Sequence, residues 1–122
     1  MDALVFFGTD NTHWMAPRLH AVHKHVWCAI RDPNGYWVET EVSVGGIVQR
    51  VVGPDYDLAT HYGPEIEVWA MQATPEDRQL TPSILNSCVG VTKSLLGIRH
   101  WSLTPYQMRK HLSRGAATCV SI

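Results

Sequence analysis

The sequence predicts an α+β fold in which a small antiparallel sheet, a meander of about four strands, packs against two C-terminal helices. Short segments rich in β-branched and aromatic residues, separated by glycine and proline turns, run from His23 to Met71, and helix signals follow after Ala73. A length of 122 residues and an apolar content of 45% are ordinary for one domain. We therefore expect a single domain over residues 1–122, with 1–19 as an N-terminal extension and 115–122 as a tail.

The first hairpin of the expected meander has the clearest local signals. The segment His23–Arg31 ends at Asp32-Pro33-Asn34-Gly35, where proline suits the second position of a turn and glycine suits its exit. Tyr36–Ser43 then returns as a strand. Gly45-Gly46 followed by the apolar segment Ile47–Val52 predicts a third strand, which extends the hairpin into a meander.

A fourth strand is expected after a break in the chain. Gly53-Pro54 ends the third strand, and Asp55–Tyr62 has room for one or two helical turns before Gly63-Pro64 breaks the chain again. The segment Glu65–Met71 alternates polar and apolar residues, which predicts a strand with one face in water.

Two helices are expected to close the chain. Cys88–Leu96 has helical spacing of its apolar residues, and Gly97 follows at the position of a left-handed C-cap. The segment Thr104–Gln107 is typical of a helix start, with threonine as the N-cap and proline in the first helical position. This second helix should run to about Arg114 and end at Gly115.

Charge and cysteine usage exclude several classes of function. A formal net charge of −1 provides no general attraction for nucleic acid or an anionic membrane, so neither is an expected partner. The three cysteines, Cys28, Cys88 and Cys119, form no CxxC pair, which argues against a disulfide framework and a cysteine-rich zinc site. We expect no cofactor.

The start of the chain does not resemble a signal peptide. Met1–Gly8 is apolar for only a few residues, lacks a basic leader and is followed by polar residues, so we expect no secretion by a signal of its own. The five tryptophans are expected mainly in the core, where their bulk compensates for the modest size of the domain. Exposed tryptophans would instead indicate an interaction surface.

Cys88 is the candidate nucleophile. A thiol becomes reactive when its thiolate is stabilised, as at a helix N-terminus beside a histidine. Asn86 or Ser87 is a good N-cap, and either would place Cys88 in the first turn, where unpaired N–H groups also favour an oxyanion. A helix that starts at Thr81-Pro82 would instead put Cys88 in mid-helix, and a cysteine on an apolar helix face is commonly just packed.

His25 is the candidate base. Strand alternation places it on one face with Trp27 and Ala29, and places Val26, Cys28 and Ile30 on the other. It gains significance as a base only if the helix of Cys88 packs on the same face, since a buried histidine often has only a structural hydrogen bond. A one-residue register slip exchanges the faces, so four polar residues of the next strand remain possible third groups. They are Glu39, Thr40, Glu41 and Ser43.

Four segments of the chain together resemble a known group of proteins. They are His25-Val-Trp-Cys-Ala-Ile, Trp37-Val-Glu39, Asn86-Ser-Cys-Val-Gly-Val-Thr-Lys-Ser-Leu-Leu-Gly-Ile98 and Thr104-Pro-Tyr-Gln-Met-Arg-Lys-His-Leu112. Residues 20–114 resemble small proteins of tailed bacteriophages and prophage-like elements, which are similar to circularly permuted NlpC-type cell-wall peptidases and lecithin:retinol acyltransferase. In that permuted order the histidine strand precedes the cysteine helix, as His25 precedes Cys88.

The resemblance implies a permuted papain-like fold with a thiol site. Cys88 would attack an amide or ester carbonyl, His25 would take and return the proton, and Glu39 would orient the imidazole. The implied substrate is a peptide or a peptidoglycan-like stem peptide. The implied location is the phage virion or the bacterial host cytoplasm.

Three other functions are compatible with the same residues. The first is a non-catalytic structural component of a virion built on the same fold, in contact with other virion proteins. The second is a deamidase, transferase or anti-defence factor that uses the Cys88–His25 pair inside the host. A metal site at His20-x2-His23-x-His25 is disfavoured, because no carboxylate or second histidine motif follows at a zinc-binding spacing.

Overall fold

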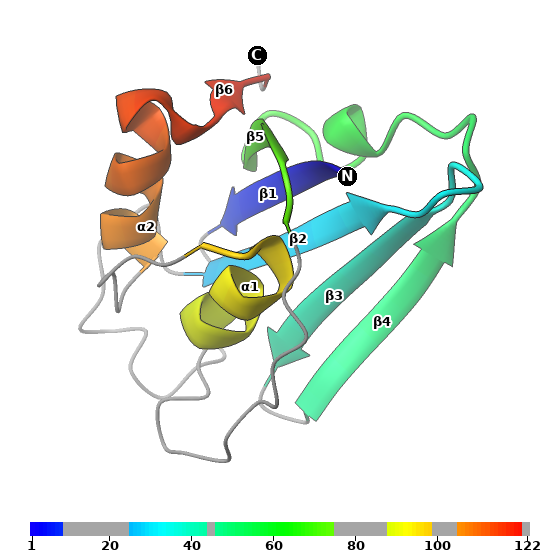
Figure 1. Cartoon of the computed structure of the whole chain (residues 1–122), viewed down its shortest axis with the longest axis horizontal. Helices are drawn as coiled ribbons and strands as arrows, with labels where there is room; N and C mark the ends of the chain where they lie inside the picture. Colours follow the sequence, from blue (N-terminus) through cyan, green and yellow to red (C-terminus); the bar gives the residue numbers. More distant parts are fainter. Residues whose placement is uncertain (9–24, 44–45, 75–87, 99–104, 121–122) are drawn as a thin grey trace.

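The computed structural model describes residues 1–8, 25–43, 46–74, 88–98 and 105–120. They form an α+β domain with a six-stranded antiparallel sheet in the order β4-β3-β2-β1-β5-β6 (Figure 1). The strands are β1 (Asp2–Gly8), β2 (His25–Arg31), β3 (Trp37–Ser43), β4 (Gly46–Val52), β5 (Glu67–Gln72) and β6 (Thr118–Cys119), and the helices are α1 (Cys88–Leu96) and α2 (Pro105–His111).

The expected hairpin between β2 and β3 is confirmed in its turn and its pairing. Gly35 donates its backbone N–H to the Asp32 carbonyl at 3.0 Å and has a φ of +90°, which suits glycine. The Asp32 side chain accepts the backbone N–H groups of Asn34 and Tyr36, both at 2.9 Å. β3 then pairs with β4 without interruption from Trp37↔Val52 to Ser43↔Gly46.

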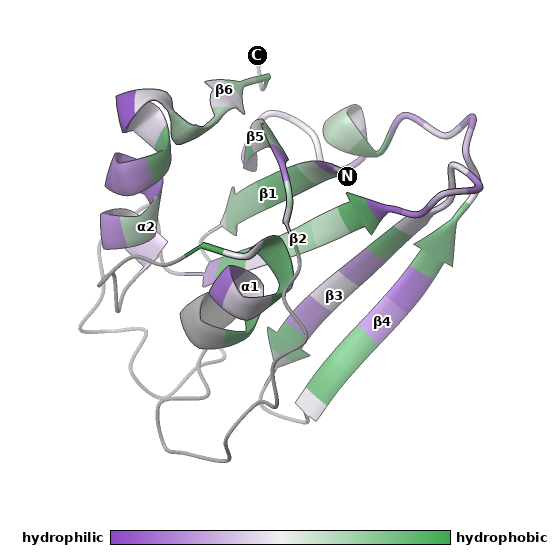
Figure 2. Ribbon diagram, in the orientation of Figure 1, coloured by the Kyte–Doolittle hydropathy of each residue, from purple (hydrophilic) through white to green (hydrophobic). Residues whose placement is uncertain are grey.

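The N-terminal segment is not an extension, as expected from the sequence, but a central strand. β1 lies between β2 and β5, and Ala3, Val5, Phe6 and Phe7 are almost completely buried. Figure 2 shows apolar colour along most of β1, whereas β3 alternates between polar and apolar residues. A strand buried on both faces has no alternation, so the apolar run at residues 3–7 could not be recognised by periodicity.

The position of β1 also changes the predicted strand order. β5, the expected fourth strand, pairs with β1 instead of extending the meander beyond β4. Part of the expected tail belongs to the sheet as well, since β6 pairs with β5 through Trp69↔Cys119 and Ala70↔Thr118. The meander is therefore β1-β2-β3-β4, with β5 and β6 added on the other side of β1.

The sheet separates two apolar clusters. Val26 and Cys28 face the helices and pack with Leu96, Met108 and other apolar residues, and we call this side the helix-covered face. Trp27 and Ala29 point to the opposite side, where Leu58 and its neighbours in the segment between β4 and β5 pack on the sheet. We call this second side the loop-covered face.

The tryptophans that the structure describes belong to the core. Trp27, Trp37 and Trp69 are 5, 8 and 7% exposed, which confirms the core assignment for these three side chains. Trp14 and Trp101 lie outside the described residues. The described tryptophans therefore supply no exposed interaction surface.

Helix α1 ends as the sequence predicts. Gly97 has a φ of +73°, and the N–H of Ile98 donates to the Lys93 carbonyl at 2.9 Å, which satisfies the helix end. A Cβ at position 97 would lie 1.9 Å from the Thr74 carbonyl oxygen, so only glycine fits this close approach. The contact holds the end of α1 against the chain after β5, where Thr74 donates to the Leu96 carbonyl.

Helix α2 begins and ends near the predicted positions. It starts at Pro105 and continues into a π-helical turn, Leu112–Ala116, in which Arg114 and Gly115 leave helical backbone angles. Thr104, the expected N-cap, lies outside the described residues, as do Asn86 and Ser87 before α1. The described helices are too short to cross a membrane.

Candidate functional site

The candidate site is a polar cluster on the loop-covered face, supplied by β2, β3, β4 and the segment before β5. Glu39 and Glu41 lie on one face of β3 because side chains two residues apart point the same way. Arg50 lies directly opposite Glu39 in the pairing of β3 with β4. His25 and Tyr62 complete the group, which we call the polar cluster.

Glu39 is the buried centre of this cluster. Its side chain is 1% exposed, and Oε1 accepts a charged hydrogen bond from Arg50 Nη1 at 2.7 Å. Oε2 accepts the hydroxyl of Tyr62 at 2.6 Å and the indole N–H of Trp27 at 3.3 Å. A buried carboxylate needs such partners, and both oxygens of Glu39 already have them.

The electrostatic environment of Tyr62 reflects the same contacts. Burial raises the pKa of Tyr62 well above its usual range, and the hydrogen bond to Glu39 and the charge of Glu39 raise it further. Tyr62 therefore stays protonated and donates to Glu39 throughout the physiological pH range.

His25 is held by Glu41 and not by Glu39. Its Nε2 lies 3.1 Å from Glu41 Oε1, and its ring stacks on Trp27 with the centroids 5.2 Å apart. Arg50 Nη2 contacts the other oxygen of Glu41 at 3.2 Å. The side chain of His25 is only 5% exposed. The predicted orienting role of Glu39 is therefore corrected, and Glu41 makes the contact.

The sheet register explains this correction. Glu39 lies opposite Ala29, which is four residues, or about 13 Å, along β2 from His25. Glu41 lies two residues closer to the start of β2, within reach of the imidazole. Both carboxylates are possible from the sequence alone, because no local signal encodes the register of β2 against β3.

The other two polar alternatives on β3 do not join the cluster. Thr40 lies opposite Cys28 in the register and accepts a hydrogen bond from Gln49 at 3.1 Å, and its side chain points away from the face that carries Glu39. The side chain of Ser43 lies outside the described part of the chain.

Helix α1 and His25 belong to different faces of the sheet. α1 packs on β2 and β3, and its Leu95 and Leu96 join the cluster of Val26 and Cys28 on the helix-covered face. The ring of His25 stacks on Trp27, which belongs to the loop-covered face. His25 could serve as the base for Cys88 only if α1 packed on the same face of the sheet as His25. The structure thus does not meet this condition.

Cys88 is the first residue of α1, but its side chain lies outside what the structure describes. Figure 1 shows α1 beginning toward the end of the sheet at which β2 begins. The predicted contact between Cys88 and His25, and the predicted oxyanion role of Asn86 and Ser87, remain predictions.

The other two cysteines have contrasting environments. Cys28 is 1% exposed within the apolar cluster of the helix-covered face. Burial raises the pKa of its thiol from the ordinary 9.0 to about 12, and the negative charge of Glu39 adds to this shift. Cys119, on β6, is exposed. Cys28 is therefore an unreactive thiol at neutral pH, because the thiolate is the nucleophilic form.

The described residues contain no group of three side chains suited to bind a metal ion. His20 and His23, which with His25 made up the disfavoured metal motif, lie outside the described residues.

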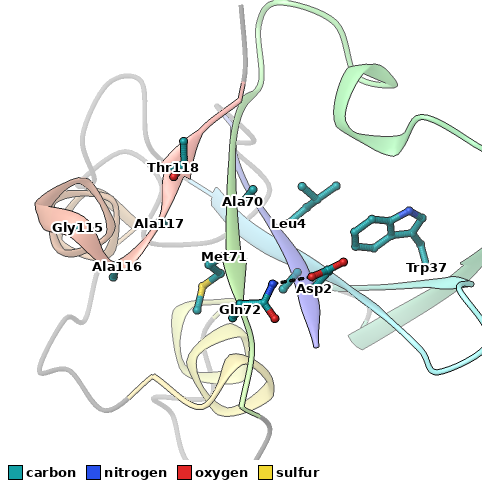
Figure 3. Close-up of a pocket in the computed structure, with 11 residues that line it drawn as sticks. Asp2, Leu4, Trp37, Ala70, Met71, Gln72, Gly115, Ala116, Ala117 and Thr118 are labelled. Carbon is teal, nitrogen blue, oxygen red and sulfur yellow. Dashed lines mark hydrogen bonds between the residues drawn. The ribbon is translucent and has the colours of Figure 1, made fainter.

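An open hollow of about 420 Å³ lies beside β1 and β5 (Figure 3), and no residue of the polar cluster lines it. Asp2 and Gln72 are among its lining residues, and the Gln72 side-chain N–H donates to Asp2 Oδ1 at 2.5 Å. The residues that line this hollow include no cysteine or histidine. It therefore brings together no nucleophile and base.

Two members of the polar cluster, Arg50 and Tyr62, were not anticipated from the sequence. Arg50 is the only charged residue in β4, which is a weak signal for a partner on the neighbouring strand. Tyr62 lies between strands, and only tertiary structure brings it to Glu39.

Comparison with known proteins yields no relative, since no family model, curated protein or solved structure matches the chain.

Proposed function

We propose that this chain is a non-catalytic assembly protein, of the structural kind found in the phage particles whose small proteins its sequence resembles. The observation that carries this proposal is the placement of His25. Its imidazole is bound to Glu41 and stacked on Trp27 on the loop-covered face, whereas α1 packs on the opposite face. A general base must reach the proton that it abstracts, so His25 is poorly placed to serve a thiol on α1.

The polar cluster has a structural role that explains its composition. Arg50 bridges Glu39 and Glu41, so it ties β4 to β3. Tyr62 attaches the segment between β4 and β5 to the buried carboxylate of Glu39. These contacts stabilise the sheet and leave Glu39 without an open position for a substrate.

A cysteine hydrolase acting on peptide or peptidoglycan-like amides is the second candidate, and two observations favour it. His25 is buried with one ring nitrogen on a carboxylate, which is how proteins orient an imidazole base. α1, which carries Cys88 as its first residue, also starts toward the end of the sheet at which β2 begins (Figure 1).

Thiol reactivity separates the two candidates. The rate of Cys88 alkylation by iodoacetamide is measured against pH on the native protein, with each cysteine quantified by mass spectrometry. An assembly protein should show Cys88 titrating at or above the free-thiol value of about 8.5, with the same profile in His25→Ala. Exposed Cys119 and buried Cys28 serve as internal references for fast and slow reaction.

His61→Ala is the matched control, because it removes an imidazole that is exposed. A Cys88 pKa well below 8.5, lost in His25→Ala and Glu41→Gln but retained in His61→Ala, would refute the assembly proposal and favour the hydrolase. Circular dichroism of each variant verifies that the fold is retained.

A further inference from the structure

β4 forms an edge of the sheet and is exposed on both faces. It pairs with β3 on one side, and no strand among the described residues pairs with its other side. Ile47, Val48 and Val51 are 55, 41 and 70% exposed. α1 packs on β2 and β3, so β4 projects beyond the helix layer, as Figure 1 shows.

The edge of β4 lacks most of the features that normally prevent edge-to-edge pairing, and its one charged residue, Arg50, is paired with Glu39 and Glu41 of β3. Proteins protect such edges with proline, lysine, bulges or inward-pointing charges. The segment Gly46–Val52 contains neither proline nor lysine, and its register with β3 runs without a bulge. Alternate residues of an antiparallel edge strand direct N–H and C=O groups outward, where another strand can pair with them.

The side chains of β4 are complementary to a second copy of the same strand. If two β4 strands run antiparallel with Gln49 opposite Gln49, Ile47 of each copy faces Val51 of the other. Ile47 and Val51 lie on the helix-covered side, since they pair with Val42 and Val38 of β3. On the other side, Val48 of each copy lies opposite Arg50 of the other, whose aliphatic stem can pack on it.

The charges also favour a second copy over a charged partner. Arg50 is the only charged residue of β4, and Glu39 and Glu41 already neutralise it. A second β4 therefore brings little like-charge repulsion. An acidic peptide would find no unpaired cation on the strand, and a basic one would find no unpaired carboxylate there.

We infer that β4 is a homodimer interface, in which two copies join their sheets into one continuous antiparallel sheet across a two-fold axis at Gln49. This inference names a partner for the proposed assembly role and rests on that role for its biological meaning. A two-fold axis repeats every contact, so the Ile47–Val51 contact between the two copies occurs twice in the dimer.

Sedimentation velocity on the full chain, from micromolar to near-millimolar concentration, tests the interface. The wild type should form dimers, and Val51→Lys should raise the dimer dissociation constant about tenfold or more, because a lysine enters the interface twice. Val120→Lys is the matched control, since Val120 is 41% exposed and follows β6 on the opposite edge of the sheet. Its dissociation constant should equal that of the wild type.

A wild type that is monomeric over the whole range would overturn the inference, and so would equal effects of the two lysine substitutions. The register is tested separately by disulfide formation in a Cys119→Ser background. Gln49→Cys should oxidise to a cross-linked dimer faster than Thr60→Cys, an exposed control site outside β4. Equal or slower cross-linking would overturn the two-fold axis at Gln49.

These results do not depend on the chemistry of Cys88. A dimer with a low-pKa Cys88 would support the interface and refute the assembly role. A monomer with an ordinary Cys88 would refute the interface and leave the assembly role standing.

Discussion

Replacement of Glu39 tests how far the polar cluster stabilises the fold. Glu39→Ala removes the acceptor for the Tyr62 hydroxyl and the Trp27 indole N–H. An unsatisfied buried donor costs about 1–3 kcal/mol, so the two together give an expected loss of about 3 kcal/mol. Arg50 adds little to this loss, because its side chain is 47% exposed and can turn to water or Glu41.

Glu39→Gln should cost less than Glu39→Ala. One amide oxygen can still accept from Tyr62 and Trp27, but the amide NH2 then faces Arg50 as a second donor, so the charged hydrogen bond is lost and two donors meet, which costs about 1 kcal/mol. Since 1 kcal/mol corresponds to about 4 °C in Tm at this chain length, the expected decreases are about 12 °C for alanine and about 4 °C for glutamine.

Urea unfolding followed by tryptophan fluorescence measures these free energies, with Glu65→Ala as the control at an exposed carboxylate. Glu39→Ala and Glu65→Ala with equal unfolding free energies would refute the role assigned to the cluster. The pKa of the Tyr62 hydroxyl provides an independent measurement. Glu39→Gln should lower the pKa of Tyr62 toward its ordinary value of about 10 but not fully, because burial is the largest cause of its elevation.

Two further predictions concern the helix end and the buried thiol. Gly97→Ala should destabilise the protein by at least about 2 kcal/mol, because position 97 has a positive φ and a Cβ there would lie 1.9 Å from the Thr74 carbonyl oxygen. Gly53→Ala is the control: a Cβ at position 53 meets nothing within 4 Å, so its thermal unfolding should be nearly unchanged. Cys28 has a raised pKa, so its contribution to stability is complete below pH 9.0 and is lost as the pH rises toward about 12. Urea titrations over that window should show a shallower loss in Cys28→Ala than in the wild type, and parallel losses would contradict the assignment.

Local signals in the sequence identified most strands and helix ends correctly. The Asp32–Gly35 turn, the α1 end at Gly97 and the start of α2 at Pro105 depend on residues within a few positions of each other, so they can be read from the chain. The strand alternation also assigned His25 and Trp27 to one face and Cys28 to the other, as the two apolar clusters confirm.

Nonlocal pairing produced the errors. β1 was not recognised because a strand buried on both faces lacks alternation, and its insertion between β2 and β5 reorders the sheet. The choice of Glu41 over Glu39 as the partner of His25 follows from the register of β2 against β3, which no local signal encodes.

The sequence by itself determined that this chain forms an α+β domain, which residues share a face of each recognised strand, and where several turns and helix ends lie. Only the tertiary structure decided which face α1 covers, which carboxylate holds His25, and that β4 forms an exposed edge. The physical reason is that backbone propensities and side-chain alternation act over a few residues. Register, layer order and burial instead depend on contacts between segments far apart in the chain.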